Sequence, residues 1–152
     1  MTATNHALTG AVIALAVKQP ALAIPLALLS HFAIDVIPHF DLSRKHPKAA
    51  KYFTSFDMLC AGAVMILIPL LLTTPVSAWL IFACMVLAVL PDSVWAWRYY
   101  KFRDIGKVIS AKPISRLTRL HQRIQLSETP RGLIIEVAWL ILMALLISNL
   151  RT

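Results

Sequence analysis

Residues 58–91 read MLCAGAVMILIPLLLTTPVSAWLIFACMVLAVLP and contain no acidic or basic side chain. Pro75, which follows two threonines, interrupts this apolar stretch near its middle. A membrane-spanning helix needs about 20 apolar residues, and proline breaks a helix interior. The stretch therefore predicts a hairpin of two membrane-spanning helices, one over residues 56–72 and one over residues 76–97.

Three more apolar segments flank this hairpin, at residues 7–17, 21–37 and 132–150. Their side chains do not alternate between apolar and polar as the strands of a membrane barrel do. The first segment is short, so it either is re-entrant or spans the membrane with its flanks included. We predict one all-α integral membrane domain over residues 1–152, a helical bundle of about five apolar helices.

The composition favours the same class of protein. Hydrophobic residues make up 59% of the 152 residues and charged residues only 14%, with a mean hydropathy of +0.72. Soluble domains have about 45–50% apolar and about 25% charged residues. These values exclude an ordinary soluble domain and a disordered chain.

The basic residues lie on one side of the predicted bundle. Of the 15 Lys and Arg residues, all except Lys18 and Arg151 fall on the side that holds the N-terminus. Positively charged loops mark the cytoplasmic side of a membrane, so this side is predicted to be cytoplasmic. Contact with membrane lipids then explains the net charge of +8, and no nucleic-acid partner is expected.

Residues 114–126 form a different kind of segment. A helix here would carry apolar side chains on one face and arginines on the other: Ile114, Leu117, Leu120 and Ile124 against Arg116, Arg119 and Arg123. His121 falls on the apolar face. This pattern predicts an interfacial amphipathic helix on the cytoplasmic surface of the membrane.

The ionisable residues within the apolar segments converge on one side. Such residues are costly inside a membrane and usually serve a function. By the predicted topology they all lie near the cytoplasmic ends of their segments: His6, His31, Asp35, Asp57, Asp92 and Glu136. Random placement would distribute them over both membrane faces, so the convergence predicts a polar site facing the cytoplasm.

His31 and Asp35 form the strongest pair of candidate metal ligands. They are four residues apart and therefore share one helix face. An imidazole with a carboxylate favours zinc, with manganese and iron as alternatives. Pro38 ends the helix and can turn His39 and Asp41 back toward the same point. We predict a divalent metal site at this position.

Three short motifs resemble the prokaryotic family of predicted membrane-bound metal-dependent hydrolases: Asn5-His6-Ala7-Leu8-Thr9-Gly10, His31-x3-Asp35-x2-Pro38-His39 and Leu90-Pro91-Asp92. The second motif also resembles the metal site of zinc-dependent phospholipase C. The resemblance implies hydrolysis in a prokaryotic inner membrane, with His6, His31, Asp35 and Asp92 as metal ligands and His39 next. The soluble phospholipases use a second His-x3-Glu pair, but here Gln125 follows His121 at that spacing. We therefore expect one or two metal ions instead of three.

The expected function is a membrane-embedded hydrolase that uses metal-activated water on a phosphoester or a phospholipid headgroup. Asp57, Glu136 and His121 are the candidates for a general base or for further ligands. Two alternatives stay open. The same residues could carry a metal ion or a proton across the membrane, or the polar cluster could only join the helices of a non-enzymatic subunit.

Overall fold

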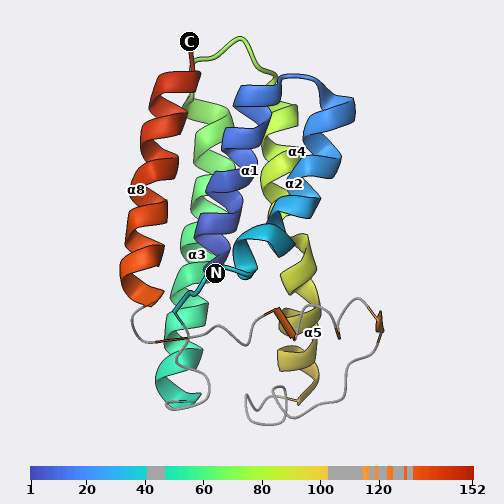
Figure 1. Cartoon of the computed structure of the whole chain (residues 1–152), viewed down its shortest axis with the longest axis vertical. Helices are drawn as coiled ribbons and strands as arrows, with labels where there is room; N and C mark the ends of the chain where they lie inside the picture. The colour runs from blue at the N-terminus through green and yellow to red at the C-terminus, as the bar shows by residue number, and fades with distance from the viewer. Residues whose placement is uncertain (41–46, 103–114, 117–118, 120–122, 125–128, 130–131) are drawn as a thin grey trace.

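The computed structural model describes residues 1–152 except 41–46, 103–114, 117–118, 120–122, 125–128 and 130–131. The described residues form helices and no strand, which confirms the all-α prediction for this part of the chain. The elements are α1 (Ala3–Val17), α2 (Pro20–Asp35), α3 (Pro47–Leu71), α4 (Ala78–Val89), the 3-10 turn η1 (Leu90–Asp92), α5 (Ser93–Phe102) and α8 (Gly132–Leu150). Figure 1 shows α1, α2, α3, α4 and α8 as an upright bundle, with α5 continuing beyond α4.

The segment predicted as one helix over residues 76–97 is divided, so that prediction is wrong in its second half. α4 ends at Val89, η1 makes a tight turn, and α5 begins at Ser93. Pro91 lies at the start of η1 and has no N–H to donate to a carbonyl one helical turn earlier. Asp92 therefore lies in a turn between two helices.

The other predicted apolar segments correspond to single helices. α8 has the predicted bounds, α1 begins earlier than predicted, and α2 ends two residues before Ile37. α3 begins at Pro47, well before residue 56. The predicted amphipathic helix over residues 114–126 falls mostly outside the described residues and stays a prediction.

α1 is the central helix and contacts α2, α3, α4 and α8. Its small residues Ala7, Ala11 and Ala14 are completely buried. Small side chains let helix backbones approach closely, as they do in membrane helix pairs. Gly10 marks such an approach, because a Cβ atom there would lie 2.5 Å from the carbonyl oxygen of Cys84 in α4.

Among the described residues, two helices are long and apolar enough to cross a membrane. Within Ala49–Leu71 and Gly132–Leu150, an 18-residue window reaches a mean hydropathy of 1.9 and 2.3, respectively. The buried shares of their apolar windows are only 6% and 17%, whereas a core helix of a soluble protein is mostly buried. Three shorter apolar helices accompany them, over Ala3–Val17, Pro20–Asp35 and Ala78–Asp92.

The helices run up and down, so their ends meet at two places (Figure 1). At one, here called the site end, α1 and α8 begin and α2 and α4 finish. At the other, the far end, α1 turns into α2 and α3 turns into α4, beside the end of α8. Lys18 makes the first of these turns in a left-handed conformation, with φ of 60°.

Candidate metal centre

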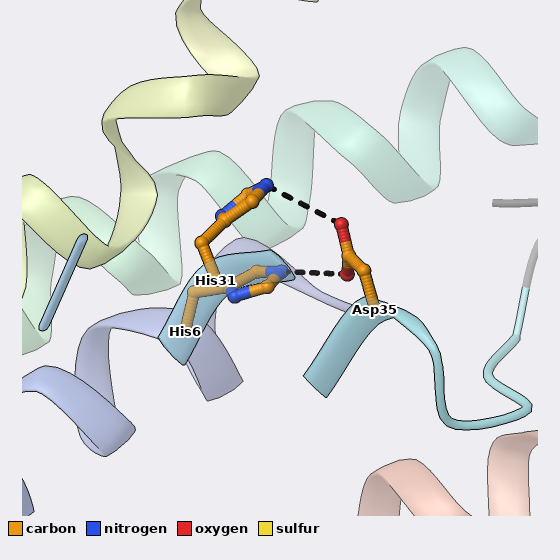
Figure 2. A group of neighbouring side chains, drawn as sticks. All are labelled: His6, His31 and Asp35. Atoms are coloured by element: carbon orange, nitrogen blue, oxygen red, sulfur yellow. Dashed lines mark hydrogen bonds and ion pairs between the residues drawn. The ribbon is translucent and has the colours of Figure 1, made fainter. Parts of the chain in front are cut away.

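Two helices bring His6, His31 and Asp35 together at the site end. His6 comes from the second turn of α1, and His31 and Asp35 lie one turn apart at the end of α2 (Figure 2). Nε2 of His6 is 3.0 Å from Oδ1 of Asp35, and Nε2 of His31 is 3.3 Å from Oδ2. One ligand atom from each residue lies within 4.8 Å of the other two, so this group could hold a metal ion.

The three side chains are buried within the bundle. His6, His31 and Asp35 all have a relative exposure of 0%. The two imidazole rings stack, with centroids 4.0 Å apart and an angle of 19° between the planes. A buried charge is costly without a partner, and the Asp35 carboxylate has one in the α-amino group of Met1, which lies 2.6 Å from its Oδ1.

The hydrogen bond on the other side of His31 sets the direction of its ring. Nδ1 of His31 donates to the carbonyl oxygen of Ala88 in α4 at 2.7 Å, and a carbonyl can only accept. In the neutral ring, Nε2 then carries a lone pair. This lone pair is directed at the carboxylate oxygens of Asp35 and Asp92, an arrangement that either a proton or a metal cation would bridge.

Beyond their mutual contact, His6 and Asp35 have different surroundings. Nδ1 of His6 is buried and has no hydrogen-bond partner among the described residues. Oδ1 of Asp35 accepts from the α-amino group of Met1 at 2.6 Å as well as facing His6. Oδ2 lies 3.3 Å from Nε2 of His31. The donor set of two imidazoles and one carboxylate fits a divalent transition metal.

Asp92 lies at the edge of this group. Its Oδ1 is 3.6 Å from Nε2 of His31, and its side chain is 15% exposed, while those of the other three residues are 1% exposed or less. The turn η1 places it there, directly after α4. Of these four residues, Asp92 is therefore the one that solvent reaches.

Asp57 and Glu136 lie at the amino end of α1 instead. Asp57 of α3 accepts hydrogen bonds from the backbone of Ala3 and Thr4, and Glu136 of α8 accepts from Thr2 and Asn5. Among the described residues, neither belongs to the group that could hold a metal. The role of general base for these two carboxylates stays a prediction, and their described contacts are those of helix caps.

His39 is buried but lies outside the group of His6, His31 and Asp35. Its Nδ1 donates to the carbonyl oxygen of Ile37 at 3.0 Å. Its own carbonyl accepts from the backbone of Thr129, and a Cβ atom at Gly132 would collide with it. His39 thus anchors the start of α8, and its role as a ligand stays a prediction. His121 and Asp41 lie outside the described residues.

Sequence reasoning missed the groups that hold the ligands. The Ala88 carbonyl leaves no trace in a sequence, because any residue could supply it. The cap of α1 is different, because the sequence carries a signal for it. Thr2 caps α1 by accepting from the backbone of Asn5, and a threonine just before an apolar helix is a signal for that role.

Comparisons with known proteins add no relative to this picture. No protein-family model, no curated protein and no solved structure matches the chain. The function must therefore be argued from the buried His6, His31 and Asp35 group and from the bundle that surrounds it.

Proposed function

We propose that the chain is a membrane-embedded, metal-dependent hydrolase that acts on a phosphoester, such as a phospholipid headgroup. The observation that carries this proposal is the buried group of His6, His31 and Asp35. Catalytic zinc sites use three such protein ligands and keep a further position for water. We therefore propose one or two zinc ions. Manganese and iron are the alternatives, because they accept the same donors.

The proposal places the bundle in a prokaryotic inner membrane, with the site end facing the cytoplasm. The exposed apolar faces of α3 and α8 support insertion. Lys18 and Arg151 lie at the far end, whereas Lys48 and Lys51 lie at the start of α3 and Arg98 and Lys101 lie in α5, on the side of the site end (Figure 1). A reporter fused after Arg44 is expected to be active in the cytoplasm. Activity on the outer side would overturn the orientation.

The chain's own residues supply the surroundings that such a reaction needs. When bound, a divalent ion polarises a phosphoryl oxygen and activates water. Asp92 is partly exposed beside His31, so it is the described carboxylate of the cluster best placed to exchange a proton with solvent. The basic residues of the same end attract an anionic headgroup. The motif resemblance to predicted membrane-bound metal-dependent hydrolases supports the same activity.

Elemental analysis of detergent-purified protein tests the metal site. Wild type is compared with a His31→Ala/Asp35→Ala double variant. The control is His46→Ala/Asp104→Ala, which replaces the same two residue types at positions outside the described residues. Stoichiometric zinc, manganese or iron in wild type and in the control, but not in the first variant, is expected. A screen of phosphoesters and phospholipids then tests hydrolysis. Absence of metal from wild type after supplementation would overturn the proposal.

A second candidate is a non-enzymatic membrane subunit whose polar cluster joins the helices. The observation that favours it is that protein groups alone connect α1, α2 and α4, through Asp35 with His6 and His31 with Ala88. Buried polar contacts between membrane helices contribute about 0.6 kcal/mol each. This candidate predicts no metal in wild type. Transport of a metal or a proton is less supported, because the described helices are apolar toward the far end.

A further inference from the structure

The amino end of α1 is buried, so its backbone N–H groups need partners within the protein. The first four N–H groups of a helix have no acceptor in the helix itself. Ala3 and Asn5 are 3% and 1% exposed, which leaves little access for water. Two carboxylates from other helices meet this need: Asp57 of α3 and Glu136 of α8.

Asp57 binds the first turn of α1 at three points. Its Oδ2 accepts from the backbone N–H of Ala3 at 2.7 Å. Its Oδ1 accepts from the backbone N–H of Thr4 at 3.1 Å and from the Thr4 hydroxyl at 2.7 Å. Both carboxylate oxygens are thereby committed to α1, and the negative charge lies at the positive end of the helix dipole.

Glu136 binds the same turn from the side of α8. Its two carboxylate oxygens accept from the backbone N–H of Thr2 at 3.1 and 3.2 Å. Oε2 also accepts from the Thr2 hydroxyl at 2.9 Å and from Nδ2 of Asn5 at 2.6 Å. The backbone carbonyl of Glu136 accepts a further bond from the same Asn5 amide, at 3.0 Å.

His6 is tied directly to this capped turn. Its backbone N–H donates to the carbonyl oxygen of Thr2 at 3.1 Å, and it follows Asn5 in the chain. Glu136 therefore binds Thr2, whose carbonyl accepts from the His6 N–H, and Asn5, which precedes His6 in the chain. A shift of the first turn would move the His6 ring away from Asp35 and from the ring of His31, on which it stacks.

We infer that Asp57 and Glu136 are positioning residues: they fix the first turn of α1 so that His6 is presented to His31 and Asp35 as a metal ligand. The inference rests on the proposed metal site. The described residues of α3 and α8 supply none of the candidate ligands. Through Asp57 and Glu136, these two helices would nevertheless determine the geometry of the site. It also explains two of the acidic residues at the site end without requiring that they touch the metal.

A cobalt titration of the purified full-length protein tests this inference, because the visible absorption bands of Co²⁺ report ligand geometry. Asp57→Asn and Glu136→Gln keep the side-chain size and remove the charge. Each is expected to weaken Co²⁺ binding by about tenfold, the scale seen when the supports of metal ligands are lost. At saturating Co²⁺, the absorption bands are expected to shift as well, which a general loss of stability would not cause.

Trp139→Phe is the matched control. Nε1 of Trp139 donates to the Thr9 hydroxyl at 3.0 Å, so this change removes another hydrogen bond between α8 and α1 but leaves the capped turn intact. Its Co²⁺ affinity and spectrum are expected to equal those of wild type. Thr4→Val is the milder variant, for use if loss of a carboxylate prevents folding. It removes the contacts of the Thr4 hydroxyl with the carboxylate and the backbone carbonyl of Asp57, and it is expected to shift the bands in the same direction.

The outcomes separate the two proposals. If wild type binds neither Co²⁺ nor Zn²⁺, the metal site fails and the inference fails with it. If wild type binds Co²⁺ and the folded Asp57 and Glu136 variants keep its affinity and spectrum, the positioning role is overturned while the metal site stands. Equal losses in Trp139→Phe would also overturn it, because any contact between α1 and α8 would then have the same effect.

Discussion

The two ends of the bundle are built in opposite ways. The site end gathers buried His, Asp, Asn and Glu side chains that hold one another and the start of α1. The far end joins its helices by short turns around a cavity of about 240 Å³, lined by Lys18, Pro75, Trp79 and mostly apolar neighbours. The buried polar side chains of this apolar chain are thus concentrated at the end where they have polar partners.

The cost of burying polar groups explains this concentration. An isolated buried charge is strongly unfavourable, but one that is paired and hydrogen-bonded is tolerated. At the site end, Asp35, Asp57 and Glu136 each accept at least two hydrogen bonds or ion pairs. Substitutions at each end, and at the point where α1 crosses α4, test whether the two ends respond differently.

The largest expected effect is that of Asp35→Asn. The amide keeps the shape of the carboxylate but loses the charge that faces both imidazoles, so metal binding is expected to be abolished and activity with it. Membrane insertion is expected to persist, because the apolar faces of α3 and α8 are unchanged. Metal content and membrane fractionation measure the two results. Full metal content in the variant would show that Asp35 is not a ligand.

Acidification is expected to have the next largest effect at the site end. Protons compete with a metal for imidazole nitrogens, so metal affinity should fall as the pH falls. Between about pH 7.5 and 5.5 we expect a loss of about tenfold or more, because the ligands must release protons to bind the metal. Isothermal titration with Zn²⁺ at each pH measures this. An affinity that does not change would indicate that His6 and His31 do not bind the metal.

Much of the fold could be predicted from the sequence, because apolar length and proline placement determine it locally. The turn at Pro75 and the bounds of α8 follow directly from such signals. The break at Pro91 was missed, because apolar residues resume after Asp92 and Ser93 and continue to Trp97. Hydrophobicity alone does not show that a proline inside such a run ends the hydrogen-bonding of a helix.

The candidate site could be predicted only in part. His31 and Asp35 share a helix face by spacing, so their proximity follows from one helix. The approach of His6 depends on how α1 packs against α2, which no local pattern specifies. The same holds for Asp57 and Glu136, whose place near the site end was predicted but whose contact with the start of α1 was not. Tertiary packing assigns partners that sequence spacing cannot.

A smaller effect is expected from Gly10→Ala, which acts between the two ends. The new Cβ atom would lie 2.5 Å from the Cys84 carbonyl oxygen and 2.8 Å from Cα of Met85, so α1 must move away from α4. Overpacking of this kind costs about 1–3 kcal/mol. Because α4 also holds the ring of His31 through Ala88, metal affinity should fall together with the unfolding temperature.

Gly62→Ala is the matched control for this change. Apart from the adjacent backbone of α3, no heavy atom of the described residues lies within 4 Å of a Cβ built at Gly62, so alanine fits there without displacing them. Alanine in place of glycine inside a helix is expected to stabilise it by about 0.5–1 kcal/mol. If both variants unfolded at the same temperature, the close crossing of α1 and α4 at Gly10 would be contradicted.

The smallest effect is expected at the far end, from Lys18→Gly. Lys18 has a φ of 60°, a conformation that costs a residue with a side chain roughly 1–2 kcal/mol and costs glycine nothing. Part of this gain is offset by the greater freedom of glycine in the unfolded chain, so a net stabilisation of a few tenths to about 1 kcal/mol is expected. Thermal unfolding in detergent measures it, and Zn²⁺ affinity should stay at the wild-type value. A loss of metal binding in this variant would show that the two ends are coupled, and the contrast between them would no longer hold.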